Sequence, residues 1–273
     1  MAKFRKAVNL YRWRDPASKY GNFGDEITVT ILDRLFGLTA IPVAMELAEL
    51  IGAGSILENF WMEQEWRKGQ PFASAASPEL HVWGSGFMLD DSKMKWPQQV
   101  HVHSVRGRLS AERLDMGDVV LGDPGILASA LIKLPPKVHG VGLVPHYVDY
   151  CSFSTTRELP RNWRAIDPEQ PVPDVLADIA ASELVVSSSL HGLIAADSFR
   201  IPCVWASTDR PLYGNPVYKF LDYQSSRGSD LNMPLSYAEL MKLSESALAQ
   251  LATKPARCIN DWQRQIADVF PFK

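Results

Sequence analysis

The sequence predicts an α/β protein in which two domains with parallel sheets face a cleft. Short apolar segments rich in β-branched residues alternate with amphipathic helical patterns along most of the chain. Strands separated by helices of this length imply parallel sheets with helical crossovers. The chain has 273 residues, of which 46% are hydrophobic and 22% charged, so it has the composition of a globular protein and the length of two ordinary domains.

A Leu134-Pro135-Pro136-Lys137 segment interrupts the alternation near the middle of the chain. Because prolines do not continue a helix or a central strand, this segment predicts the linker between the domains. We therefore expect an N-terminal α/β domain over residues 1–134 and a C-terminal α/β domain over 137–235. Helices over 236–273 are expected to pack back on the body.

In the first half, a helix is predicted to follow Gly24 and to end at Gly37. Its apolar side chains recur at helical spacing, at Ile27, Ile31, Leu32, Leu35 and Phe36. The other elements expected here are strands at 47–52, 81–83, 100–105 and 119–122, and a helix at 107–116.

The second half repeats the alternation. The expected elements are strands at 138–144, 184–187 and 202–206, and helices at 173–182 and 191–199. Ser236 and Glu239 have the spacing of a capping box, which opens a helix with Leu240, Leu243 and Leu251 facing inward. A last helix is expected to bury Ile259, Trp262 and Ile266.

Charge, hydropathy and cysteine content exclude several classes of protein. The formal net charge is −3, whereas a dedicated nucleic-acid-binding domain has a basic excess. No apolar run approaches the ~20 residues that span a bilayer, and the basic N-terminus leads into an apolar segment too short for a signal peptide. The cysteines, Cys151, Cys203 and Cys258, form neither a disulfide framework nor a metal-binding motif. We expect a cytoplasmic protein.

Two glycine-containing loops of the first half are candidate ligand sites. The first is Gly21-Asn22-Phe23-Gly24-Asp25, which precedes the expected helix. Its glycines let the backbone approach a ligand, and the N–H groups at the helix start can face an anion, so Asn22 and Asp25 are candidate site residues. Asp25 also fits a plain charge that complements the helix dipole. Gly84 and Ser85 follow a strand in Val82-Trp83-Gly84-Ser85-Gly86, which fits either a ligand-approach loop or a tight turn.

Arg106 and His146 each follow an expected strand, where ligands bind in parallel sheets. Arg106 suits bidentate capture of a phosphate or carboxylate, or it pairs on the surface with Glu112 or Asp115. His146 precedes an expected irregular stretch of more than twenty residues, of the kind that often carries function. A hydrogen-bonded structural histidine fits the same position.

The most informative segment is Ser187-Ser188-Ser189-Leu190-His191-Gly192, which follows an apolar strand and opens a helix. The positive end of a helix tends to lower the pKa of an imidazole, so His191 is a candidate proton donor or acceptor. Ser188 and Ser189 either bind a phosphate or cap the helix. After Ala206, basic and aromatic residues that include Lys219 indicate a lid or a solvated loop.

Together these segments resemble the polysaccharide pyruvyl transferase family, and most closely the bacterial exopolysaccharide ketal-pyruvate transferases of the succinoglycan and xanthan type. The resemblance covers roughly residues 7–225. It rests on short segments in the right order: Asn22-Phe23-Gly24-Asp25, Val82-Trp83-Gly84-Ser85-Gly86, Ser104-Val105-Arg106-Gly107, Gly122-Asp123-Pro124-Gly125, Val144-Pro145-His146-Tyr147, Ser187-Ser188-Ser189-Leu190-His191-Gly192 and Lys219-Phe220.

The resemblance implies a fold of two Rossmann-like domains, similar to that of the GT-B glycosyltransferases, with the active site in the cleft. It also implies phosphoenolpyruvate as donor and a sugar diol as acceptor, yielding a cyclic pyruvate ketal on an exopolysaccharide or cell-surface glycan precursor. Nothing is oxidised in this reaction, so no cofactor is expected. No metal is expected either, because enough hydrogen-bond donors around the phosphate let it leave.

The resemblance also implies roles for individual residues. His191 is expected to be the principal acid or base, and Asp25 to orient or deprotonate an acceptor hydroxyl. His146 is a second proton-transfer or donor-binding group. Arg106, assisted by Lys219, is expected to hold the phosphate or carboxylate of the donor. Further substrate-binding positions are Asn22, Gly84, Ser85, Ser188 and Ser189.

Two positions depart from the family pattern. Arg108 stands where proline usually follows the arginine-glycine pair, and Ser189 stands where more distant members carry arginine. The anion-binding role of that arginine must then fall on Arg106, Lys219 or backbone N–H groups.

Acceptors in this family are commonly lipid-linked, so peripheral contact with the cytoplasmic face of the inner membrane is expected. Lys3, Arg5 and Lys6 would favour it. Two other functions fit the same pattern. One is a glycosyltransferase of GT-B type that uses a nucleotide sugar, although the second half has no glutamate-rich motif suited to a ribose. The other is an inactive carbohydrate-binding homologue.

Overall fold

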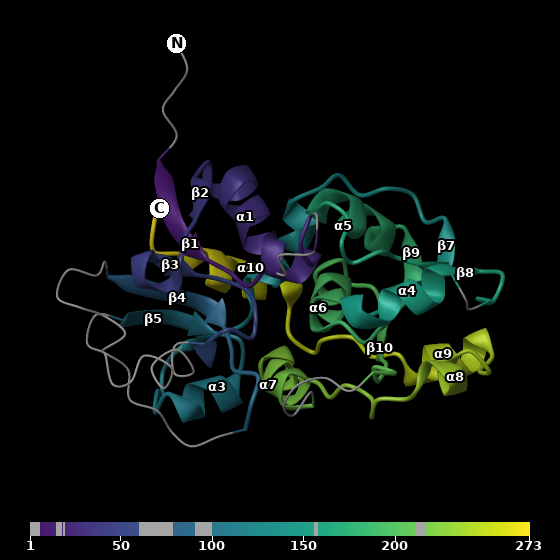
Figure 1. Ribbon diagram of the computed structural model, residues 1–273. Helices are drawn as coiled ribbons and strands as arrows, with labels where there is room; N and C mark the ends of the chain where they lie inside the picture. The colour runs from purple at the N-terminus through teal and green to yellow at the C-terminus, as the bar shows by residue number, and fades with distance from the viewer. Residues whose placement is uncertain are drawn as a thin grey trace, which may run out of the picture.

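The computed structural model describes residues 6–14, 18, 20–59, 79–90, 100–155, 158–210 and 217–273. Two parallel sheets lie side by side, with helices between and around them (Figure 1). The first sheet has six strands in the order β2-β1-β3-β4-β5-β6, and the second has four in the order β10-β9-β7-β8. The predicted α/β class with parallel sheets is therefore confirmed. Lys3, Arg5 and part of the expected lid fall outside the described residues.

The first sheet comes from the part of the chain before the predicted linker. Its strands are β1 (Ala7–Tyr11), β2 (Thr39–Pro42), β3 (Leu50–Ile51), β4 (Leu80–Ser85), β5 (Val100–Val105) and β6 (Val120–Leu121). Its helices are α1 (Phe23–Phe36), α3 (Arg108–Arg113) and the 3-10 helices η1 (Met45–Leu47) and η2 (Pro124–Ala130). The strand expected at 47–52 is shortened because η1 occupies its beginning, and β1 and β2 were not predicted.

The second sheet comes from the part after the predicted linker. Its strands are β7 (His139–Val144), β8 (Trp163–Ala165), β9 (Ser182–Ser187) and β10 (Cys203–Trp205). The helices that accompany it are α4 (Tyr147–Thr155), α5 (Val172–Ala180), α6 (Leu190–Ser198) and α7 (Tyr218–Arg227). Two expectations are wrong here. The stretch after His146 contains α4 and β8, and Lys219 lies on helix α7, where Phe220 and Tyr223 are buried core residues rather than parts of a lid.

The last part of the chain forms helices α8 (Tyr237–Leu240), α9 (Glu245–Leu251) and α10 (Ile259–Asp268). The Ser236–Glu239 capping box is present, but the helix that it opens ends after one turn and α9 begins separately. Helix α10 packs on the first sheet, because Trp262 Nε1 donates to the Leu121 carbonyl at 2.9 Å and Trp83 Nε1 donates to the Ile266 carbonyl at 2.8 Å. None of the helices in the described part of the chain is both long and apolar enough to cross a membrane.

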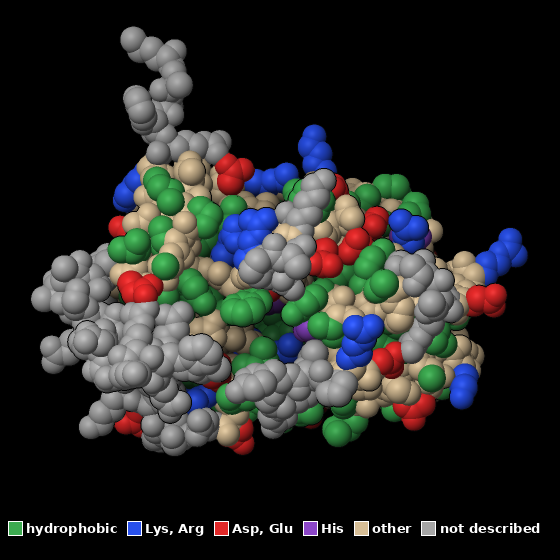
Figure 2. All heavy atoms as spheres, in the orientation of Figure 1, with side chains coloured by type: hydrophobic (Ala, Val, Ile, Leu, Met, Phe, Trp, Pro, Cys, Tyr) green, Lys and Arg blue, Asp and Glu red, His purple; other side chains and the backbone are tan. Residues whose placement is uncertain are grey.

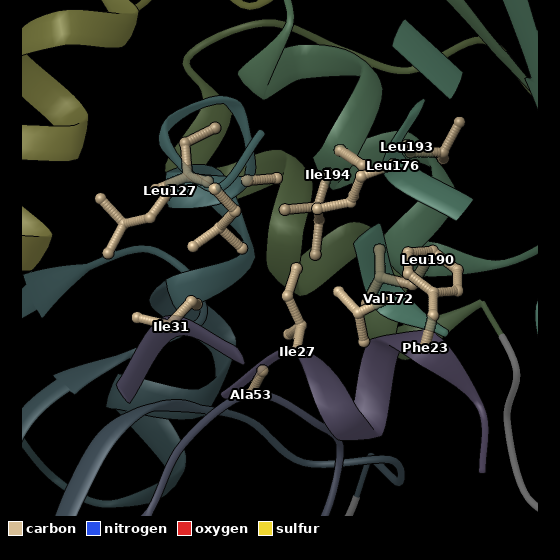
Figure 3. Close-up of a cluster of buried hydrophobic side chains, with 14 of the residues drawn as sticks. Phe23, Ile27, Ile31, Ala53, Leu127, Val172, Leu176, Leu190, Leu193 and Ile194 are labelled. Carbon is tan, nitrogen blue, oxygen red and sulfur yellow. The ribbon is translucent and has the colours of Figure 1, made fainter. Parts of the chain in front are cut away.

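One continuous hydrophobic core occupies the space between the two sheets. Helix α1 of the first part faces α5 and α6 of the second, with Ile27 directed at the side chains of these helices (Figure 3). The same core takes in η2 and α10. This packing fixes the N-termini of α1 and α6 relative to each other, and both lie at the candidate site. The domain boundaries and the GT-B-like arrangement remain predictions.

Candidate active site

A cavity of about 410 Å³ lies where loops from both parts of the chain meet. Figure 2 shows the hollow near the centre of this face, with purple histidine and blue basic surface visible between green side chains. Six of the predicted site residues line it: Asn22, Asp25, His146, Ser189, His191 and Lys219. The chain thus brings together residues more than 190 positions apart, because the N-termini of α1 and α6 and the beginning of α7 all face this cavity.

His191 lies in the first turn of α6, between the start of α1 and the start of η2. Its Nε2 is 3.5 Å from Oδ2 of Asp123, a carboxylate with 0% exposure. The other oxygen of Asp123 accepts a hydrogen bond from the Gly125 N–H at 2.8 Å. A Cβ atom on Gly24 would overlap the imidazole, so glycine is required there. The ring is therefore held from two sides.

Asp25 lies in the first turn of α1 and faces the cavity. Its Oδ2 accepts a hydrogen bond from Asn22 Nδ2 at 3.0 Å, and Asn22 also caps the helix through Gly24 N–H. Burial raises the pKa of the Asp25 carboxyl, while His191, Asn22 and Lys219 partly offset that effect. A carboxylate with a raised pKa accepts a proton more readily than an ordinary aspartate. Asp25 is therefore suited to act as a base.

Lys219 and His146 complete the polar part of the cavity. Burial, and then the nearby Arg106 cation, lower the pKa of Lys219 to about 8, so the side chain is mainly cationic at neutral pH. Burial and the charge of Lys219 lower the pKa of His146 to about 3, so this imidazole is neutral. Its Nδ1 accepts from the Val148 N–H at 3.5 Å, which leaves the proton on Nε2. His146 is therefore a neutral hydrogen-bond donor rather than a cationic acid.

Residues 79–210 match the family model described as polysaccharide pyruvyl transferase, and they contain His146, Ser189 and His191 of the six cavity residues. The chain is therefore similar to this family over just under half of its length. The matched region includes the strand ends that carry Arg106, His146 and His191, and it confirms the resemblance that the short segments predict. Two regions of the site, α1 with Asp25 and α7 with Lys219, lie outside the matched residues.

Two curated relatives are similar to this chain. An uncharacterized protein, L143 of Acanthamoeba polyphaga mimivirus, is 31% identical over 187 residues, which are 62% of this chain and 62% of the relative. The succinoglycan biosynthesis protein ExoV of Rhizobium meliloti (strain 1021) is 28% identical over 227 residues, which are 80% of this chain and 64% of the relative. The chain thus spans less than two thirds of the length of either relative.

Four predicted site residues do not line the cavity. Gly84 has a φ of 80° and lies against Pro124 of η2, and the buried Ser85 hydroxyl donates to the Gly54 carbonyl at 2.9 Å. Ser188 is 1% exposed, and its hydroxyl accepts from the His146 N–H at 2.8 Å. Arg106 is 0% exposed, and its guanidinium donates to Asp222, Ser55 and the Phe87 carbonyl.

Other residues of the site were not predicted. The segment containing Asp123 was noticed in the sequence but had no role, and its contact with His191 becomes visible only when η2 meets α6. Trp13 and Tyr147 add aromatic surface to the cavity, and Trp13 is 50% exposed. Glu58 holds one wall by accepting from the N–H groups of Met88 and Leu89 at 2.6 and 2.7 Å. No periodicity or motif marks Trp13 or Glu58.

The site offers anion-binding and proton-transfer groups. The described residues contain no group of three or more histidine, cysteine, aspartate or glutamate side chains arranged to hold a metal ion. Helix α6 and helix α1 both begin at the cavity, and the positive ends of their helix dipoles favour negative charge there. With the cationic Lys219, they form a surface for a phosphate or carboxylate beside His191 and Asp25.

Proposed function

We propose that this protein transfers the pyruvyl group of phosphoenolpyruvate to a sugar diol of an exopolysaccharide or cell-surface glycan precursor, forming a pyruvate ketal. The observation that carries the proposal is the meeting of His191, Asp25 and Lys219 in one cavity at two helix N-termini. The reaction requires an acid, a base and a site for a strongly anionic donor, and these residues supply all three. The match to the polysaccharide pyruvyl transferase family model supports the same chemistry.

The donor is proposed to lie against α6 and Lys219. The start of α6 with the Ser189 hydroxyl, the Lys219 ammonium and the neutral His146 N–H would contact its phosphate and carboxylate. Charge-assisted hydrogen bonds of this kind are the strongest available to an anion. Arg106, which the sequence suggests as the main anion ligand, would act indirectly, because its donors are already used within the protein.

Proton transfer is proposed to proceed between the two helices. His191 donates a proton to carbon 3 of the enol while Asp25 removes the proton of the first sugar hydroxyl, whose oxygen attacks carbon 2. The phosphate then leaves with the C2–O bond electrons. The second hydroxyl attacks carbon 2, its proton is released, and the ketal closes. Asp123 holds the His191 ring and stabilises its protonated form during the reaction.

The proposed acceptor is a free or lipid-linked oligosaccharide. The cavity wall contributed by Trp13 and Tyr147 supports this proposal, because aromatic rings stack on the apolar faces of sugars. A position at the cytoplasmic face of the inner membrane is part of the same proposal, since a lipid-linked acceptor would be presented there.

The donor can be identified by ligand-dependent stability. Thermal unfolding of the purified protein is measured with phosphoenolpyruvate, UDP and UDP-glucose in parallel. A ligand at about 100 times its Kd adds about 2.7 kcal/mol to the free energy of unfolding, which corresponds to a rise of several degrees at about 2–4 °C per kcal/mol. We expect the rise with phosphoenolpyruvate only, and its loss in Lys219→Met but not in the exposed control Lys242→Met. A rise with UDP alone would favour a glycosyltransferase instead.

The reaction itself is tested by release of inorganic phosphate from phosphoenolpyruvate in the presence of acceptor glycan. His191→Ala is expected to lower kcat by about 10²–10⁴-fold, as removal of an acid or base typically does. A folded His191→Ala protein that retains most of its turnover would contradict the assignment. Binding of glycan without any phosphate release in the native protein would favour the inactive carbohydrate-binding alternative.

A further inference from the structure

Helix α7 follows the second sheet in the chain but packs on both sheets. Its first residue, Tyr218, is buried in the hydrophobic cluster that contains Phe87 and Val105 of the first part. The next residue but one, Phe220, stacks on Trp205 of β10 with ring centroids 4.5 Å apart. In Figure 1 the helix lies between α3 and β10. Lys219 lies between these two contacts, so its position depends on how α7 is attached to each side.

The attachment to the first part is a buried polar network around Asp222. One oxygen of Asp222 accepts from Arg106 Nε at 2.9 Å and from the Ser110 hydroxyl at 2.6 Å. The other oxygen accepts from the Ser110 N–H at 2.9 Å. Arg106, Asp222 and Ser110 all have 0% exposure. Gly107 lies directly against the Asp222 carbonyl, where a Cβ atom would overlap it.

We infer that Arg106, Ser110 and Asp222 are positioning residues that hold Lys219 in the cavity by fixing α7 to the first part of the chain. Lys219 and Asp222 are three residues apart and share one side of the helix. Anchoring Asp222 therefore sets both the rotation of α7 and its depth. The catalytic consequence rests on the proposed function, whereas the placement of Lys219 can be tested without substrate.

The network explains why Arg106 and Gly107 lie together in the sequence. The arginine supplies the donors for Asp222, and the glycine allows the α7 backbone to approach α3. A buried ion pair contributes little net stability compared with well-packed apolar groups, but it tolerates few alternative geometries. This favours a role in fixing position. At its other end, α7 is tied to α6 by Arg227, which donates to both oxygens of Asp197 at 2.6 and 2.9 Å.

The experiment is competitive acetylation of the full-length protein with acetic anhydride over a range of pH, with Lys219 labelling quantified by peptide mass spectrometry. In the native protein the labelling midpoint is expected near the pKa of about 8. In Asp222→Asn it should rise toward the ordinary lysine value of about 10.4, as α7 loosens and Lys219 gains water. Arg106→Gln should raise it for a second reason as well, because the Arg106 cation itself lowers the pKa of Lys219. Ser110→Ala should shift it in the same direction by less. The control Ser226→Ala removes the hydroxyl of another buried serine, but one that bonds within α7 to the Tyr223 carbonyl at 2.8 Å, and it should leave the midpoint unchanged.

An unchanged midpoint in folded Asp222→Asn or Ser110→Ala, each checked by circular dichroism, would overturn the inference. If the charge-removing variants fail to fold, the inference is tested by comparing the labelling midpoint of Ser110→Ala with that of Ser226→Ala. In turnover assays, the positioning role predicts that Asp222→Asn raises the KM for phosphoenolpyruvate by about tenfold or more with a smaller fall in kcat. Protection of Lys219 from acetylation by phosphoenolpyruvate tests the proposed donor site separately. If there is no such protection in the native protein but the variants still shift the labelling midpoint, the positioning role of the network is supported and the proposed donor site is wrong.

Discussion

At the scale of single residues, the site depends on how closely neighbouring groups hold His191. Asp123 is fully buried and faces Nε2, and Gly24 lies against the other side of the ring. A buried carboxylate beside an imidazole fixes its tautomer and stabilises its protonated form. The sequence motif around His191 shows only the imidazole, because its two supports come from α1 and η2.

The substitution Asp123→Asn tests this support. The carboxamide oxygen can still accept the Gly125 N–H, so the start of η2 is retained, but the negative charge facing His191 is lost. We expect kcat to fall by about 10²-fold or more with little change in the KM for phosphoenolpyruvate. Steady-state phosphate release measures both constants. Native kcat in a folded Asp123→Asn protein would show that Asp123 is only a helix cap.

The pH dependence of the reaction follows from Lys219 and Asp25. Lys219 must be cationic to bind the donor, and its pKa is lowered to about 8, so the KM for phosphoenolpyruvate should rise as the pH rises above 8. Burial raises the pKa of Asp25. As the pH is lowered, Asp25 is therefore protonated at a higher pH than an exposed aspartate, and kcat/KM falls because the base form is lost. Arginine stays charged throughout this range. A Lys219→Arg variant that kept the alkaline rise at the same pH would exclude Lys219 as its cause.

At the scale of elements, the alternating pattern predicted most of the sheet strands and helices correctly. Strand β5 and helix α10 have the expected positions, and in α10 the predicted apolar residues Ile259, Trp262 and Ile266 are the buried ones. Strand β2 was missed because it lies at a sheet edge and its side chains are mostly exposed. Helix α7 was missed because polar residues such as Lys219 and Asp222 interrupt its apolar pattern. They are buried only through partners on distant parts of the chain, which periodicity does not reveal.

The sequence also did not reveal which distant residues pair with the predicted site residues. The motifs identified the residues at strand ends and helix starts, and six of them line the cavity. They did not distinguish a ligand from a support, and the surface partners suggested for Arg106 gave no sign of Asp222. That distinction depends on which donors and acceptors the fold has already used, as it has for the Arg106 guanidinium and the Ser188 hydroxyl.

Helix α1 offers a matched pair of glycine substitutions. Gly24→Ala should displace His191 and lower kcat by at least about tenfold, because the added Cβ overlaps the ring. Gly37→Ala, at the C-cap with a φ of 65° and open space around it, should leave kcat unchanged. It should lower the free energy of unfolding by about 1–2 kcal/mol through the left-handed conformation. Urea unfolding and phosphate release measure the two effects, and equal kcat values in both variants would contradict the close approach.

At the scale of the whole molecule, the two sheets share a large core between them, and each part also has a smaller hydrophobic cluster of its own. Residues of α1 and η2 pack with residues of α5 and α6 in a single cluster. Helix α7 adds polar contacts to both parts, through Asp222 and Arg227. The shared core and helix α7 therefore join the two parts of the described chain.

This shared core predicts a single cooperative unfolding transition. Urea unfolding followed by tryptophan fluorescence and by far-ultraviolet circular dichroism should give coincident midpoints, because loss of either sheet exposes the core of both. The fluorescence of Trp83 reports on the first part of the chain, and that of Trp163 and Trp205 on the second. Replacing Trp83 in one variant, and Trp163 with Trp205 in another, by phenylalanine shows which part each fluorescence change comes from. Two resolved transitions would instead support the separate domains expected from the sequence.

The contact of α10 with the first sheet also constrains the order in which the chain acquires structure during synthesis. The indole N–H of Trp83 has its acceptor at Ile266, and the Leu121 carbonyl has its donor on Trp262. The sheet that is translated first therefore cannot complete its interior until the residues of α10 have left the ribosome. A nascent chain of this protein must hold a partly open sheet until then, and chaperones that bind exposed apolar strands are the factors expected to protect it.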